Sequence, residues 1–161
     1  MENYDDELRA IYRSTSMIGY STSVSVIIYG IIAYYMVAGS ANRQPVFAQV
    51  EMIRAIFCFV GFSLIVAIGL MNRMNSRDIK KKGLTPAEML RHFQTRSIVI
   101  FGICEFIGIL GLILTMMTKN INDYYGLGFL SLFSFGFFFP KLYVWDEQMK
   151  GAGISSEGID S

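Results

Sequence analysis

Apolar residues gather in four long runs along the chain, and short polar stretches separate the runs. The runs cover about residues 16–38, 47–71, 97–118 and 124–145. About 20 consecutive apolar residues in a helix are enough to cross the hydrocarbon core of a bilayer. Because that core offers no water to the backbone N–H and C=O groups, such segments cross it as helices. The pattern predicts an all-α integral membrane protein with a four-helix transmembrane domain over residues 16–145.

Polar segments flank this domain at both ends. Residues 1–15 begin with acidic side chains, and three apolar residues then fall on one helical face: Leu8, Ile11 and Tyr12. This spacing predicts a short amphipathic helix in the headgroup region, and a frayed terminus is the alternative. Residues 146–161 are mostly small and polar, so they are expected to form a flexible tail.

The extended polar segment lies between the second and third runs, at residues 72–96. It carries seven basic residues: Arg73, Arg77, Lys80, Lys81, Lys82, Arg91 and Arg96. Thr85 and Glu88 have the spacing of a capping box, and Pro86 stands at the first helical position. A helix is therefore predicted to begin here and to continue into the third run.

The basic residues divide unequally between the two sides of a membrane that is crossed four times. Eleven of the fourteen fall on one side: the seven above with Arg9, Arg13, Lys141 and Lys150, against Arg43, Arg54 and Lys119 on the other. Since short cytoplasmic segments carry an excess of Lys and Arg, both termini are predicted to be cytoplasmic. The chain is then a multi-pass protein of the cell inner membrane, made of two helical hairpins.

Composition supports the membrane class and argues against several others. The chain is 53% hydrophobic and 17% charged, with a mean hydropathy of +0.42, which is more apolar than an ordinary soluble domain. A net charge of +1 argues against a nucleic-acid partner. Cys58 and Cys104 lie inside apolar runs, and His92 is the single histidine. No disulfide, metal site or haem-ligating pair is predicted, and no cofactor is evident.

One carboxylate, Glu105, stands inside the third apolar run. An ionised side chain near the bilayer centre costs roughly 2.5 to 3.5 kcal/mol, so an acid there usually has a function. The nearest cation of the same run is Arg96, about 13 Å away along a helix, and cannot pair with it. A buried carboxyl without a charged partner can donate a hydrogen bond or exchange a proton. Its partner is expected from another helix or another chain.

Small residues mark the helix faces that are expected to pack closely. In the third run these are Gly102, Gly108 and Gly111, and in the second Gly61 and Gly69. Small side chains let helix backbones approach each other in a bilayer. Hydroxyl side chains in the first half of the first run can bond to their own helix or to a neighbour: Ser16, Ser21, Thr22, Ser23 and Ser25.

Two further features concern the ends of the second and fourth runs. Glu51 and Arg54, three residues apart, predict an interfacial ion pair. The fourth run holds six phenylalanines between residues 129 and 139, and Pro140 predicts a kink near its end. Tyr143 and Trp145 suit the membrane interface. A phenylalanine face can pack on lipid or other helices, or hold a quinone, pigment or lipid tail.

The segment GICEFIGILGLIL around Glu105 resembles the carboxylate-bearing helix of the proteolipid c subunit of rotary ATP synthases. In that family an acid is followed by an aliphatic stretch and a Gly-Leu pair, here Gly111-Leu112. The resemblance implies that Glu105 takes up and releases a proton or sodium ion in an oligomeric ring. The triplet Arg43-Gln44-Pro45, which the family has before its carboxylate helix, here precedes the second run. The chain also looks like small four-helix bacterial membrane proteins with a glutamate in the third span.

Three functions follow from these observations. The first is a non-enzymatic subunit that packs within a larger membrane complex or homo-oligomer through its glycine-rich faces and Glu105. The second is a proton- or sodium-carrying transport component, and the third is a subunit that binds a hydrophobic cofactor. The sequence has no phosphate loop, metal-ligand spacing or nucleophile with a base in reach, so no catalytic residue is predicted.

Overall fold

The computed structural model describes residues 2–39, 49–82 and 85–151 of the 161-residue chain. They form five α-helices: α1 (Glu2–Ala38), α2 (Val50–Lys82), α3 (Pro86–Thr118), α4 (Ile121–Phe138) and α5 (Leu142–Gly151). The prediction of an all-α protein is confirmed over the part of the chain that the structure describes. Residues 40–45, in the short polar stretch after the first run, lie outside the described residues.

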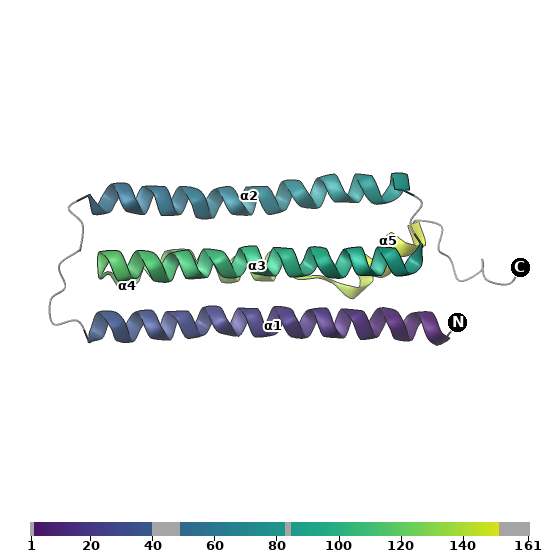
Figure 1. Cartoon of the computed structure of the whole chain (residues 1–161), viewed down its shortest axis with the longest axis horizontal. Coiled ribbons are helices and arrows are strands. Elements are labelled where there is room, and N and C mark those ends of the chain that lie inside the picture. The colour runs from purple at the N-terminus through teal and green to yellow at the C-terminus, as the bar shows by residue number, and fades with distance from the viewer. Residues whose placement is uncertain (1, 40–48, 83–84, 152–161) are drawn as a thin grey trace, which may run out of the picture.

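The helices pack around α3, which contacts each of the other four. Figure 1 shows α1 and α2 on opposite sides of α3, with α4 beside α3 along its length. α1 and α3 begin, and α2 ends, at one end of the bundle, which we call the N-terminal end. The parallel direction of the first and third runs is as the sequence predicts. Of the first predicted hairpin, the structure shows the opposite directions of α1 and α2 but no packing between them along their lengths, because α3 lies between them.

α3 and α4 do form a tight hairpin, joined by Lys119 and Asn120. Lys119 adopts a left-handed conformation (φ 55°) and its N–H bonds to the carbonyl of Thr115 at 2.9 Å, which closes α3. The side chain of Asn120 accepts a hydrogen bond from the N–H of Asn122 and caps α4. The second predicted hairpin is therefore present.

The predicted break between an amphipathic N-terminal helix and the first apolar run is absent. α1 is one helix of 37 residues, about 55 Å long at 1.5 Å per residue. Its described residues before Gly19 include neither glycine nor proline, and Leu8 and Thr15 are buried against the rest of the chain. These contacts keep the first turns aligned with the apolar part of the same helix.

The polar segment 72–96 is helical over most of its described residues. α2 continues to Lys82, and α3 begins at Pro86. The predicted capping box is confirmed: the Thr85 N–H donates to Glu88 Oε2 at 2.9 Å. α3 then runs without interruption into the third apolar run, as predicted.

The fourth run bends where Pro140 predicts it. α4 ends at Phe138, α5 begins at Leu142, and their axes differ by 42°. Because proline has no N–H to donate, the helical ladder cannot pass through this position. The run 124–145 is thus divided between two helices. Residues 146–151, expected in a flexible tail, instead belong to α5.

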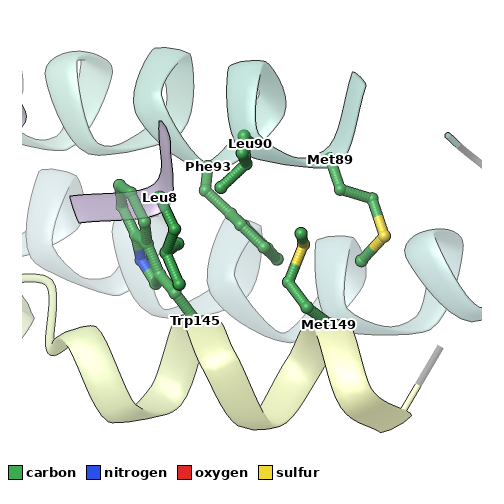
Figure 2. Close-up of a cluster of buried hydrophobic side chains, with 6 residues drawn as sticks. All are labelled: Leu8, Met89, Leu90, Phe93, Trp145 and Met149. Carbon is green, nitrogen blue, oxygen red and sulfur yellow. The ribbon is translucent and has the colours of Figure 1, made fainter. Parts of the chain in front are cut away.

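A cluster of buried apolar side chains fixes α5 at the N-terminal end of the bundle. It consists of Leu8 from α1, Met89, Leu90 and Phe93 from α3, and Trp145 and Met149 from α5 (Figure 2). Trp145 stacks on Phe93 at 5.5 Å between ring centroids and meets Tyr12 edge-on at 5.7 Å. Trp145 is therefore a core residue and not the exposed interfacial side chain that the sequence suggests, whereas Tyr143 is exposed.

Candidate functional site: the carboxyl of Glu105 and its contacts

The carboxylate of Glu105 meets two hydroxyl groups of α1. Ser25 Oγ donates to Glu105 Oε1 at 2.6 Å, and Tyr29 OH donates to the same oxygen at 3.0 Å. Ser25 and Tyr29 are four residues apart and so lie on one face of α1. The partner of the carboxyl thus comes from another helix of the same chain.

The hydroxyl of Ser25 can serve Glu105 in either protonation state. Its oxygen lies 2.6 Å from Glu105 Oε1 and 2.7 Å from the carbonyl oxygen of Thr22. A serine hydroxyl has one proton to donate and two lone pairs that accept. When Glu105 is ionised, Ser25 donates to it. When Glu105 is protonated, it can donate to Ser25, which then donates to Thr22.

The sequence includes Ser25 among five serine and threonine residues of the first run but pairs none of them with Glu105, and it misses Tyr29. The i, i+4 spacing of Ser25 and Tyr29 is the signal that could have found it. Other hydroxyls of this run bond within α1, as expected: Thr22 to the carbonyl of Ile18 and Ser23 to that of Gly19.

Arg54 forms the predicted ion pair and a second one that the sequence did not indicate. Its Nη1 lies 2.5 Å from Glu51 Oε1, and its Nε lies 2.8 Å from Asp123 Oδ1 on α4. The Glu51 side chain is 85% exposed, and that of Asp123 is 11% exposed. The second pair joins α2 to α4, and because Asp123 is mostly buried, solvent screens this pair less than the first. Asp123 follows the third apolar run closely, so only the packing of α2 on α4 brings it to Arg54.

Three of the five predicted packing glycines lie at helix contacts. A methyl group on Gly111 would stand 3.0 Å from Cβ of Leu127, one on Gly61 3.1 Å from Cδ2 of Leu127, and one on Gly108 3.2 Å from Val26. A methyl group on Gly69 or Gly102 would meet nothing within 4 Å. The first three glycines are used within the chain, and the last two face open space.

Two hydroxyls of α4 reach backbone carbonyls of neighbouring helices beside glycines. Tyr124 OH donates to the carbonyl of Val26 on α1, and Ser131 Oγ donates to that of Cys104 on α3 at 2.6 Å. Gly30 and Gly108 stand four residues after these two carbonyls. Since a helical side chain covers the turn before it, glycine there leaves the carbonyl open to a second donor.

The phenylalanines of the fourth run divide into an outer and an inner set. Phe129, Phe133 and Phe137 stack along the exposed side of α4, with centroids 6.3 and 6.4 Å apart. Phe135 and Phe139 turn inward and pack on Phe101 of α3, each at 5.7 Å. The outer set offers an apolar ridge, and the inner set belongs to the core.

Within residues 2–39, 49–82 and 85–151, fold and site together define an all-helical arrangement with three helices long and apolar enough to cross a membrane, or four if α4 and α5 form one bent span. Comparisons with protein-family models, with curated proteins and with solved structures find no match to this chain.

Proposed function

We propose that the chain is a non-enzymatic, multi-pass protein of the cell inner membrane that acts as a subunit of a larger membrane complex or homo-oligomer. In this proposal both termini are cytoplasmic, and Glu105 holds α1 against α3 within the subunit. Partner chains pack on the open sides of α1 and α2.

The exposed face of α2 is the observation that supports this role best. α2 contacts the rest of the chain along one side only, and Phe59, Phe62 and Val66 are exposed. On the exposed side Ser63 and Ala67 are four residues apart. In a bilayer there is no hydrophobic force between helices, so close approach over small residues is a main source of association. A pair of small residues at this spacing favours a partner helix over lipid alone.

A bulky residue on this face tests the proposal. Ala67→Leu would keep α2 apolar, but its larger side chain would push a partner helix that packs over Ser63 and Ala67 away from α2. We expect the cross-linked assembly in native membranes to fall several-fold relative to the unmodified chain. Val99→Leu, which adds bulk at an exposed position of α3 and leaves the α2 face untouched, is the control and should leave assembly unchanged. Equal assembly of both variants and the unmodified chain would argue against a subunit role for this face.

The oxygen atoms around Glu105 favour a proton- or sodium-carrying role as a second candidate. Glu105 Oε1, Ser25 Oγ, Tyr29 OH and the Thr22 carbonyl form a connected set. Such oxygens suit a proton or a hard cation. A membrane-soluble carbodiimide should then modify Glu105 in native membranes, more slowly when sodium is added if sodium is the ion. Failure to label Glu105 under any of these conditions would remove this candidate.

A further inference from the structure

A cavity of about 260 Å³ lies at the bend between α4 and α5, against the first half of α3. Its lining includes the aromatic side chains of Phe137 to Phe139 and the polar side chains of Arg96, Ser97, Lys141 and Gln148. The cavity is therefore amphipathic, with two cations and several aromatic rings among its lining residues.

The charges in this cavity are all positive. Arg96 is half-buried and Lys141 is exposed, and no Asp or Glu is among the residues that line the cavity. In the described part of the chain neither cation takes part in an ion pair. Lys141 Nζ lies 6.0 Å from the ring centroid of Tyr143. A half-buried guanidinium loses hydration without gaining a counter-charge, so a bound anion would stabilise it.

The start of α5 adds to the positive potential. The N–H groups of Val144 and Trp145 bond to the carbonyl of Lys141. Those of Leu142 and Tyr143 are therefore the first N–H groups of this ten-residue helix. Tyr143 is among the residues that line the cavity. A helix N-terminus carries a partial positive charge and favours anions. The bend itself is held in place, because Tyr12 OH donates to the carbonyl of Pro140 at 3.2 Å.

We propose that this cavity binds the phosphate group of an anionic phospholipid. Arg96 is the last basic residue before the apolar run 97–118, and Phe137 to Phe139 end the apolar stretch that begins in α4. Both lie where polar and apolar segments meet, which is the level of the phosphates when the helices cross a bilayer. A guanidinium can hold two phosphate oxygens at once, and the phenylalanines can cover the start of an acyl chain. The inference rests on the membrane insertion proposed above, and it is independent of the subunit role.

Trp145 provides a direct readout, because it lines the cavity and is the single tryptophan of the chain. The full chain in mild detergent is titrated with dioctanoyl phosphatidylglycerol, dioctanoyl phosphatidylcholine or inorganic phosphate while Trp145 fluorescence is followed. We expect saturable binding of phosphatidylglycerol, at least tenfold weaker binding of the zwitterionic lipid, and no saturation by phosphate over the same range. The first comparison tests the need for net negative charge, and the second tests the need for the lipid body.

Arg96→Gln should weaken phosphatidylglycerol binding about tenfold or more, as loss of a charged hydrogen-bonding partner does. Arg91→Gln is the matched control, since Arg91 is exposed on the same helix and does not line the cavity. Circular dichroism checks the fold of both variants. If Arg96→Gln loses its helical signal, Lys141→Gln takes its place, with an expected threefold or greater loss of affinity.

Equal binding of both lipids, or unchanged binding in the cavity variants, would overturn the proposal. An equal loss in Arg91→Gln would also overturn it, because it would show general attraction by charge. Saturation by inorganic phosphate at the same concentrations as the lipid would reject the lipid as the ligand. If the unmodified chain fails to bind phosphatidylglycerol but still fractionates with membranes and still assembles, the lipid site is rejected while the proposed function stays intact.

Discussion

At the scale of single residues, the third apolar run tolerates Glu105 because two hydroxyls of α1 bond to it. Ser25 and Tyr29 both donate to Oε1, so a polar group that would otherwise face apolar surroundings has partners. An interhelical hydrogen bond in a membrane protein contributes about 0.6 kcal/mol on average. The contact therefore adds modestly to stability and strongly to the register of α1 on α3.

Substitution of Glu105 separates hydrogen bonding from charge. The amide oxygen of Glu105→Gln can accept from both hydroxyls, so its unfolding free energy in mild detergent should lie within about 0.5 kcal/mol of the unmodified chain. Glu105→Leu removes the acceptor and should cost about 1 to 2 kcal/mol, since Tyr29 loses its partner and Ser25 retains Thr22. Unfolding by a denaturing detergent measures both. A Gln variant as destabilised as the Leu variant would mean that the carboxylate charge, and not its acceptor oxygen, holds α1.

At the scale of helices, glycines decide which faces come close. Gly111 sits against Cβ of Leu127, whereas a methyl group on Gly102 of the same helix would meet nothing within 4 Å. Cβ of Leu127 is fixed to the backbone of α4, so a methyl group on Gly111 can be accommodated only if the two helices move apart.

Gly111→Ala and Gly102→Ala form a matched pair on α3. We expect Gly111→Ala to destabilise the protein by about 1 to 3 kcal/mol, the usual range for overpacking. Gly102→Ala should be neutral or slightly stabilising, because alanine favours a helix over glycine. Thermal unfolding of both variants in the same detergent compares them. Equal effects would mean that the α3–α4 contact does not depend on the small residue at position 111.

α5 is held to the bundle by one apolar face, on which Trp145 and Met149 are buried. Trp145→Ala removes the ring that stacks on Phe93. It should lower the free energy that holds α5 against the bundle by about 3 to 5 kcal/mol, so that α5 detaches locally. Hydrogen exchange of the amides in residues 142–151 should then accelerate by two orders of magnitude or more. Tyr143→Ala, at a position that is 63% exposed, is the control and should leave exchange almost unchanged. Protection that persists in Trp145→Ala would show that other contacts dock α5.

At the scale of the whole molecule, helices α1, α2 and α3 are longer than a bilayer requires. α3 has 33 residues and is about 50 Å long, against a hydrocarbon core of about 30 Å. The excess lies at the N-terminal end, where the cluster of Leu8, Phe93 and Trp145 packs three helices together. If this end lies in water, as the topology proposal has it, burial of apolar surface stabilises this cluster in a way that is not available within the lipid.

Cysteine accessibility tests the orientation. In a background with Cys58 and Cys104 replaced by alanine, single cysteines are placed at the exposed positions Arg9, Arg91 and Asn122. An impermeant maleimide added to intact spheroplasts should label Asn122→Cys at once, but Arg9→Cys and Arg91→Cys only after lysis. The reason is that segments rich in Lys and Arg stay on the cytoplasmic side of the membrane. The opposite pattern would reverse the topology, and labelling of all three would argue against membrane insertion.

The sequence alone determined the helical class, the apolar lengths and the local signals along the chain. The capping box at Thr85, the bend at Pro140 and the Glu51–Arg54 pair depend on residues close together in the chain, so their spacing was enough to predict them. The same local information led to errors at two helix ends. Residues 2–15 continue the helix of the first apolar run instead of forming a separate one, and residues 146–151 are helical instead of a flexible tail. Leu8, Trp145 and Met149 pack with α3 at these two ends, and no local pattern contains that contact.

Only the tertiary structure decided which groups meet across helices. The partners of Glu105 lie about eighty residues earlier in the chain, and Asp123 reaches Arg54 across 69 residues. The rotation of each helix about its axis sets such pairs, and on helices that are apolar almost all round the hydrophobic pattern does not specify it. Close packing over Gly108 and Gly111 and hydroxyl bonds from Tyr124 and Ser131 fix that rotation instead.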